Sequence, residues 1–331
     1  MTAIPGKADT CVIHIGTEKT GTSSLQRFLS KNRLAFKAEG VVYPSFTGAN
    51  GGSQWGFFAA LPRECWQAEV GARLGISDRR AAERYGEDLI KSIDHELASC
   101  PSPRTLVISS EHFHSRLQSS ESIAALKHLV SRWSDNFRII VYFRRQDRVA
   151  LSYYSTKLKT GDRQVQVFPA AGPNDLPYYY DYARIYSNWA SVFGASAMRP
   201  RLYARHELAD GDLITDFCLS TGLHPGGKPR PPRINESLNK HGIALIHILN
   251  DLWPATTARK VQPFRHRLVS LISKTFSGQT YPVSRDEARR FYGQFRACNR
   301  QLASQAFPMR KAPLFSEDFS DYPATLADSE T

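Results

Sequence analysis

The loop Gly16-Thr17-Glu18-Lys19-Thr20-Gly21-Thr22-Ser23 carries the residues of this sequence best suited to chemistry. Its glycines let the backbone approach an anion closely, and the hydroxyls of Thr20, Thr22 and Ser23 can donate hydrogen bonds to phosphate oxygens. Lys19 adds a positive charge. An apolar run precedes the loop and a helical pattern follows it, so backbone N–H groups and the helix dipole should converge there on an anion. The loop is predicted to bind a phosphate-like group.

The position of the lysine distinguishes this loop from the Walker A loop of nucleoside triphosphatases. A Walker A loop reads GxxxxGK[ST], with lysine directly after the second glycine. Thr22 occupies that position here, and Lys19 precedes Gly21 by two residues. A kinase of a nucleotide or sugar is therefore the weaker alternative. A non-catalytic nucleotide- or glycan-binding protein is a third interpretation.

A second polar motif follows another apolar stretch. Residues 137–143 are typical of a buried strand, Arg144 comes directly after them, and Ser152 lies eight residues further on in a helical pattern. A guanidinium can bind two oxygens of one phosphate, and a serine hydroxyl can add a third contact. Arg144 and Ser152 are therefore candidates to bind a second phosphate.

Both motifs resemble those of the superfamily of sulfotransferases that depend on 3′-phosphoadenosine-5′-phosphosulfate (PAPS). Glu18 to Ser23, with Leu25 behind them, resemble the 5′-phosphosulfate-binding loop, and Arg144 with Ser152 resembles the 3′-phosphate motif. Up to about Leu223 the chain is most similar in character to bacterial carbohydrate-type sulfotransferases. It lacks the RKGxxGxWK-type motif of the cytosolic small-molecule sulfotransferases.

The resemblance implies an enzyme that transfers a sulfuryl group from PAPS to a hydroxyl or amine of an acceptor and releases the 3′,5′-bisphosphate PAP. It implies a carbohydrate, a glycolipid or a small molecule as acceptor, and no metal. It also assigns binding of PAPS to seven residues, namely Lys19, Thr20, Gly21, Thr22, Ser23, Arg144 and Ser152. Lys19 is in addition expected to stabilise the charge that grows on the leaving phosphate.

A general base for the acceptor is expected at the end of the strand 105–109. The run Ser109-Ser110-Glu111-His112-Phe113-His114 enters the same edge of the sheet as the loop. Glu111 and His112 are the candidates, and related enzymes use either a glutamate or a histidine; Glu111 is preferred. His112 and His114 lack a third ligand at a recognisable spacing, so a metal site is not expected.

The elements that must position these residues alternate between strand and helix. Strands are predicted over 11–15, 105–109, 137–143 and 201–203, and amphipathic helices over 85–97, 123–133, 147–158 and 182–193. This alternation indicates an α/β fold with a doubly wound, mostly parallel sheet and a P-loop-like phosphosulfate-binding loop.

A helical C-terminal extension is expected beyond the Pro- and Gly-rich stretch 225–232. Helical patterns cover 238–253, 264–276 and 288–302. The predicted organisation is a PAPS-binding α/β domain over 1–232, a helical extension over 233–312 that packs on it, and a loose tail over 313–331.

The net charge and the cysteines indicate which kinds of partner and which cellular compartment to expect. The sequence has 43 Lys and Arg against 31 Asp and Glu, a formal charge of +12 that favours anionic partners. It shows neither zinc-finger spacing nor an aromatic RNA-binding signature, so nucleic acid is not expected. The five cysteines form no CxxC pair, which favours a cytoplasmic location. No apolar run reaches the roughly 18 residues of a transmembrane segment, so none is expected.

Overall fold

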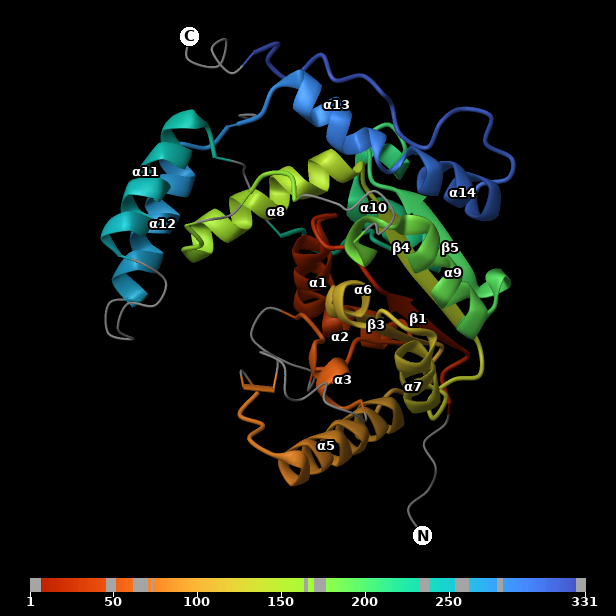
Figure 1. Ribbon diagram of the computed structural model, residues 1–331. Coiled ribbons are helices and arrows are strands. Elements are labelled where there is room, and N and C mark those ends of the chain that lie inside the picture. Colours follow the sequence, from red (N-terminus) through yellow and green to blue (C-terminus); the bar gives the residue numbers. More distant parts are fainter. Residues whose placement is uncertain are drawn as a thin grey trace. The chain divides into compact units, whose positions relative to one another are not determined.

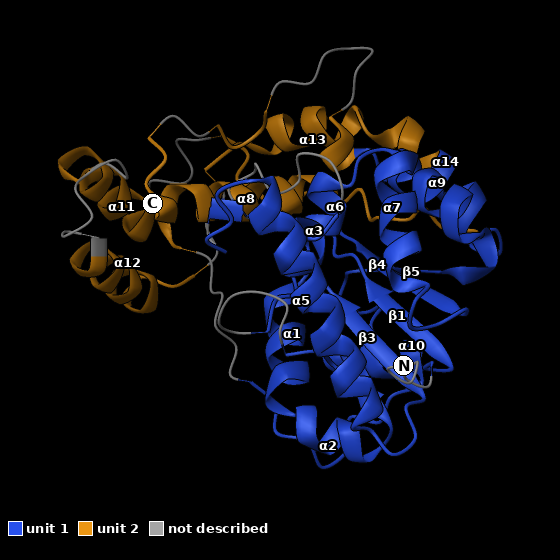
Figure 2. Ribbon diagram, turned by 90° about the horizontal axis from the view of Figure 1, so that it is seen from below, with its two compact units in different colours: residues 1–144, 181–231, 301–310 blue, residues 145–180, 232–300, 311–331 orange. Residues whose placement is uncertain are grey.

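A computed structural model of the chain describes residues 7–45, 52–61, 71–72, 74–163, 166–169, 177–231, 238–253, 262–278 and 282–325. Its described residues group into two compact units, shown in blue and orange in Figure 2. Unit 1 comprises residues 1–144, 181–231 and 301–310, and unit 2 comprises residues 145–180, 232–300 and 311–331. The helix expected over 147–158 thus falls in unit 2, whereas the sequence had placed it within one domain over 1–232.

Unit 1 is built on a five-stranded sheet in which every strand pair is parallel (Figure 1). The strands are β1 (Thr10–His14), β2 (Val41–Val42), β3 (Thr105–Ser109), β4 (Phe137–Phe143) and β5 (Met198–Leu202), in the order β2-β3-β1-β4-β5. This confirms the predicted α/β class and parallel sheet. The short strand β2 was not predicted, and β5 begins three residues before the expected 201–203. The order makes β1 the central strand, so the loop after β1 lies between the ends of β3 and β4.

Helices cover both faces of the sheet, which explains why the buried stretches of β1, β3 and β4 are mostly apolar. On one face, α1 (Thr22–Lys31), α2 (Arg33–Ala38) and α10 (Leu213–Thr221) pack against alternate strand residues. That core includes Val12, Val107 and Ile140 of the strands with Phe28 and Phe217 of the helices. Intervening strand residues such as Ile13, Ile108 and Ile139 are also fully buried.

The second set of unit 1 helices comprises α3 (Gly56–Ala59), α5 (Arg79–Ala98), α6 (His112–Arg116), α7 (Ser120–Val130) and α9 (Tyr182–Phe193). Phe137 of β4 makes an edge contact with Phe193 of α9 at 5.2 Å between ring centroids. Trp189 stacks on Phe193 one turn away, and Trp189 is fully buried. These aromatic contacts hold α9 against the sheet beside the strand that leads to Arg144.

Unit 2 is helical, as the sequence predicted for the C-terminal extension. It contains α8 (Gln146–Thr160), α11 (Lys240–Leu252), α12 (Gln262–Thr275) and α13 (Arg285–Gly293). The helix expected over 288–302 is divided into α13 and α14 (Arg296–Ala306). Leu158 of α8 and Ile246 and Leu249 of α11 form the centre of a small apolar core.

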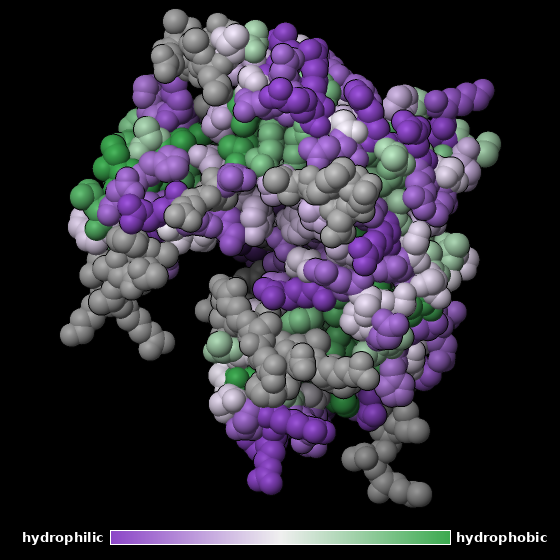
Figure 3. Space-filling view, in the orientation of Figure 1, coloured by the Kyte–Doolittle hydropathy of each residue, from purple (hydrophilic) through white to green (hydrophobic). Residues whose placement is uncertain are grey.

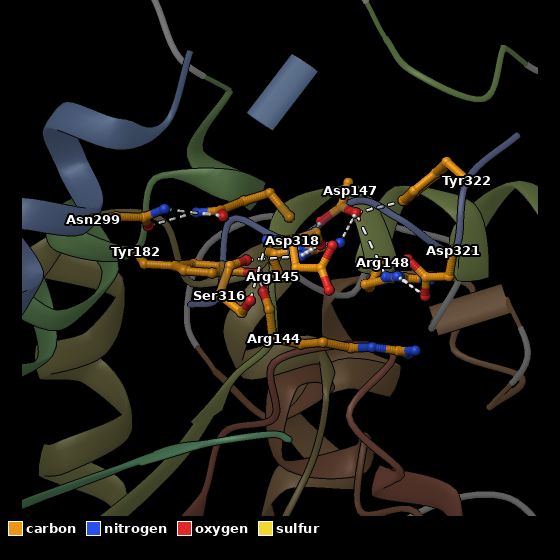
Figure 4. Close-up of polar contacts among 11 residues, drawn as sticks. Arg144, Arg145, Asp147, Arg148, Tyr182, Asn299, Ser316, Asp318, Asp321 and Tyr322 are labelled. Atoms are coloured by element: carbon orange, nitrogen blue, oxygen red, sulfur yellow. Dashed lines mark hydrogen bonds and ion pairs between the residues drawn. The ribbon is translucent and has the colours of Figure 1, made fainter. Parts of the chain in front are cut away.

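The segment from residue 313, expected to be a loose tail, is instead packed as far as residue 325, the last residue that the structure describes. Arg145 donates hydrogen bonds to the carbonyls of Ser316 at 2.7 Å and Asp318 at 2.6 Å (Figure 4). It also forms a fork onto buried Asp147, which accepts a hydrogen bond from Tyr322. The tail is ordered because it supplies partners to a buried carboxylate, which would be costly if unpaired.

No helix among the described residues combines the length and the apolar composition needed to cross a membrane.

Candidate active site

The loop between β1 and α1 turns at Lys19 and Gly21. Lys19 adopts a φ of 66°, in the left-handed region that is uncommon for a side-chain-bearing residue, and Gly21 has a φ of 80°. A Cβ atom on Gly21 would lie 2.6 Å from Cδ2 of Leu213, so any other residue there would require that side chain to shift as well as adopt the left-handed conformation. Gly21 is the N-cap of α1 and brings no side chain to cap it. The first N–H groups of the helix, those of Thr22 and Ser23, are thus available to an anion.

Two hydroxyls predicted to face phosphate are used inside the loop. Thr20 donates to the carbonyl of Thr17 at 2.6 Å, and the Thr22 hydroxyl lies 3.4 Å from the same oxygen. Both side chains are buried, whereas Ser23 is exposed. Since a hydroxyl has one hydrogen to donate, Thr20 acts here as a brace of the loop, and its backbone N–H is the group left for an anion.

Arg144 lies directly after β4 and reaches the loop. Its Nη1 donates to the carbonyl of Lys19 at 2.9 Å, and its guanidinium lies over the Tyr203 ring, 5.5 Å from the centroid. The backbone of Arg144 is held from the other side, because the Tyr182 hydroxyl donates to its carbonyl at 2.6 Å. The Arg144 guanidinium, from the end of β4, is therefore held against the backbone of the loop after β1, across 125 residues of sequence.

Ser152 lies in the second turn of α8, in unit 2, and is half-buried. Its carbonyl accepts a hydrogen bond from Thr156 at 3.0 Å. Arg144 belongs to unit 1, so pairing of the two residues at a phosphate stays a prediction.

Glu111 lies beside the loop, as the sequence predicted from its place after β3. Its Cα would be 3.6 Å from a Cβ on Gly16, the residue that opens the loop. One carboxylate oxygen, Oε2, accepts hydrogen bonds from Gln26 of α1 at 2.8 Å and from Ser53 at 3.4 Å. Within the described residues its other oxygen, Oε1, has no hydrogen-bond partner, and it can accept a proton.

His112 is engaged elsewhere. Its Nδ1 accepts a hydrogen bond from Nε of Arg116 at 3.2 Å, one turn further along α6. The centroid of its ring lies 6.1 Å from that of Trp55 and 6.5 Å from that of Phe58. Because Nδ1 already accepts from a guanidinium, His112 could take a proton from an acceptor only at Nε2.

Comparison with known proteins gives limited similarity. No family model matches the chain. An uncharacterized protein of Archaeoglobus fulgidus is 27% identical over 220 residues, which are 64% of this chain. The matched part is 56% of that protein, so the chain spans about half the length of the curated relative it matches.

Among solved structures, a sulfotransferase from Alicyclobacillus acidocaldarius is similar to this chain. The TM-score is 0.47 at 14% identity, over 91% of this chain and 96% of that one. A likeness of this size carries no argument about activity. The functional interpretation therefore depends on the residues at the loop.

Two residues at the loop were not among the predicted site residues. His114 is fully buried, and its Nδ1 accepts a hydrogen bond from the N–H of Glu18 at 3.3 Å. Tyr203 follows β5, and its hydroxyl would be 3.2 Å from a Cβ on Gly21. The position of Tyr203 directly after a strand was the available signal, because carboxyl ends of parallel strands share one edge. For His114 the sequence carried no such signal beyond its closeness to Glu111.

His14 ends β1 beneath the loop and is almost completely buried. Its Nδ1 lies 2.8 Å from the Ser109 hydroxyl of β3, and its Nε2 has no hydrogen-bond partner within the described residues. Burial lowers the pKa of His14 to about 3, because an apolar environment disfavours the charged imidazolium. The neutral ring thus joins β1 and β3 below the site without adding charge to it.

Proposed function

We propose that the chain is a PAPS-dependent sulfotransferase acting on a hydroxyl or amine of a carbohydrate or glycolipid. The observation that carries this proposal is the hydrogen bond from Arg144 to the Lys19 carbonyl, which places a guanidinium at the loop that leads into the N-terminus of α1. PAPS carries anionic groups at both its 5′ and 3′ positions. Cations and unpaired N–H groups at the carboxyl edge of a parallel sheet suit such a ligand.

In this proposal the loop binds the 5′-phosphosulfate. Lys19, Thr20, Gly21, Thr22 and Ser23 present backbone N–H groups, the Ser23 hydroxyl and the Lys19 ammonium to it. The left-handed conformation of Lys19 suits this role, since such strain is concentrated at functional sites. Arg144, with Ser152, binds the 3′-phosphate. A guanidinium carries five N–H donors, so one side chain can contact both a carbonyl and a phosphate.

Glu111 serves as the general base. The acceptor oxygen or nitrogen attacks sulfur, the bond between sulfur and the bridging phosphate oxygen breaks, and PAP leaves. Glu111 takes the acceptor proton on Oε1 while Gln26 and Ser53 hold Oε2. Lys19 stabilises the negative charge that develops on the bridging oxygen. His112 is the alternative base.

The acceptor and the compartment are proposed from the sequence. The carbohydrate or glycolipid acceptor rests on the resemblance of the first 223 residues. The cysteines Cys11, Cys100, Cys218 and Cys298 are free and buried, which suits a reducing cytoplasm.

The test compares the melting temperature of the protein with PAP, ATP and NAD, followed by transfer from radiolabelled PAPS to a panel of glycans and glycolipids. A ligand that binds only the folded state raises the melting temperature. PAP is expected to stabilise the protein and ATP to have little effect. Stabilisation by ATP alone would support the kinase, and PAP binding without transfer to any acceptor would support a non-catalytic protein.

A further inference from the structure

Helices α11 and α12 expose an apolar stripe on unit 2. On α11 it consists of Leu245, Ile248 and Leu252, which are 36%, 56% and 66% exposed. On α12 it consists of Phe264 and Leu271, which are 53% and 60% exposed. Figure 3 shows apolar surface gathered over these two helices.

Other exposed large apolar side chains of the described residues are scattered. They are Leu34 of α2, Leu219 of α10 and Met309. Single exposed apolar residues are ordinary, but a contiguous set on two neighbouring helices marks an interaction surface.

The two helices run antiparallel. The N–H of Asn239, before α11, donates to the carbonyl of Phe276, after α12, at 2.9 Å. At the other end the rings of Trp253 and Phe264 lie 6.1 Å apart. This register places Leu245 level with Leu271, and Leu252 level with Phe264. The apolar stripe therefore continues from one helix to the next.

The contacts with α8 lie on another flank of α11. His247 pairs with the Tyr154 hydroxyl at 3.1 Å, and Asn250 donates to the carbonyl of Leu158 at 2.9 Å. At about 100° per residue, Leu245 and Leu252 point well away from His247 and Asn250.

The same relationship holds on α12. Arg265 is buried and donates to the carbonyl of Lys159, the next residue of α8, at 3.2 Å. Phe264 and Leu271 are turned about 100° or more from Arg265 around the helix. Both halves of the apolar stripe therefore face away from α8.

Positive charge borders the apolar stripe. Arg267 and Lys274 are exposed, lie seven residues apart on α12 beside Leu271, and form no ion pair with any described residue. Asp251 is the only Asp or Glu between residues 240 and 276 in the sequence, and it is bound to Arg163 at 2.8 Å. Nothing acidic in this segment offsets the basic border.

We infer that α11 and α12 dock on an anionic lipid surface. Exposed apolar side chains flanked by Arg and Lys are the composition of helices that lie in the interface plane of a membrane. Anionic headgroups attract such a border, whereas a second copy of the hairpin would bring like charges together. This inference goes beyond the proposed sulfuryl transfer and does not depend on it.

The experiment measures partition of the full chain onto vesicles by flotation. Vesicles of phosphatidylcholine with phosphatidylserine are compared with vesicles of phosphatidylcholine alone. The chain is expected to float with the anionic vesicles and to be released as salt is raised. The triple variant Ile248→Gln, Leu252→Gln, Leu271→Gln should bind at least about tenfold more weakly because it removes the inserted apolar surface.

A second variant tests the charged border without touching apolar packing. Arg267→Gln with Lys274→Gln should weaken binding about fivefold for each charge removed. The matched controls are Leu34→Gln with Leu219→Gln, and Arg300→Gln with Lys311→Gln, which change exposed residues on other elements. All variants are checked for an unchanged melting temperature.

Several outcomes would overturn the inference. The first is wild-type protein that stays with the aqueous phase at low salt, and the second is equal weakening in the control variants. A third is that the chain does not bind vesicles but dimerises as its concentration rises, and that the triple variant abolishes the dimer. The stripe would then be a contact between copies. None of these readouts involves sulfuryl transfer, so they leave the proposed activity untouched.

Discussion

The guanidinium of Arg144 donates a hydrogen bond to the backbone carbonyl of Lys19 at 2.9 Å, across 125 residues of sequence. This contact ties the end of β4 to the loop after β1. It makes Arg144 both a support of the loop and a neighbour of any anion bound there.

Replacing Arg144 should weaken PAP selectively. Arg144→Ala removes charge-assisted hydrogen bonds worth about 1.5–3 kcal/mol, so PAP should bind roughly ten- to a hundredfold more weakly by calorimetry. Adenosine 5′-phosphosulfate, which lacks the 3′-phosphate, should lose little affinity. Arg144→Lys keeps the charge but loses the forked guanidinium, so its PAP affinity should lie between those of wild type and Arg144→Ala. An equal loss for both ligands would mean that Arg144 acts only through the Lys19 carbonyl.

Lys19 should matter for transfer more than for folding. Lys19→Met keeps an unbranched side chain while removing the charge proposed to stabilise the leaving phosphate, so turnover should fall by about a hundredfold. Lys31→Met, at the C-terminal end of the helix α1 that follows the loop, is the control and should retain its rate. A Lys19→Met enzyme within about twofold of wild type, less than 0.5 kcal/mol of barrier, would exclude this role.

Glu111 should be needed for chemistry rather than nucleotide binding. Glu111→Gln can still accept from Gln26 but cannot take a proton, so turnover at saturating PAPS should fall about a hundredfold or more. PAP affinity should hardly change. His112→Ala should stay within about threefold of wild type. The reverse pattern, with the histidine variant inactive and the glutamine variant active, would exchange the two roles.

Acid should destabilise the protein through His14. The pKa of His14 is lowered to about 3 in the folded chain, whereas an unfolded histidine titrates near pH 6.5. Between pH 6.5 and about 3, His14 binds a proton in the unfolded state but not in the folded state. Stability should therefore fall as pH drops from 6.5 toward 3, by up to about 1.4 kcal/mol per pH unit.

Urea unfolding of wild type and His14→Asn across this pH range measures the effect. In the variant, the free energy of unfolding should fall less steeply with decreasing pH, by the contribution of about one bound proton. His128→Asn changes an exposed histidine and should leave the slope unchanged. If His14→Asn keeps the wild-type slope, another group is responsible.

The C-terminal segment should stabilise unit 2. Tyr322→Phe removes a buried hydroxyl that donates to Asp147, whose side chain is fully buried, and should cost about 1–3 kcal/mol of unfolding free energy. Tyr153→Phe, at a half-buried tyrosine of the same helix α8, keeps the ring contact with Tyr179 and should cost little. Equal melting temperatures for the two variants would contradict the importance of this contact.

The local features of this protein could be predicted from the sequence. Apolar runs and helical periodicity indicated β1, β3 and β4 and the helices between them, because burial on both faces of a parallel sheet leaves a clear local pattern. The loop Gly16–Ser23 was recognisable from its glycines, hydroxyls and lysine. The two-residue strand β2 and the break between α13 and α14 left no such pattern.

The tertiary structure decided which of these residues meet. The order β2-β3-β1-β4-β5 places the ends of β3 and β4 on either side of the loop, and strand order is not written in any local stretch. With this order Arg144 reaches Lys19, and Gln26 binds Glu111. The docking of residues 313–325 likewise depends on buried Asp147, whose need for partners appears only once α8 is packed. Buried polar groups must find hydrogen-bond partners, and in these cases the partners come from distant segments of the chain. Which segments meet is determined only by the complete fold.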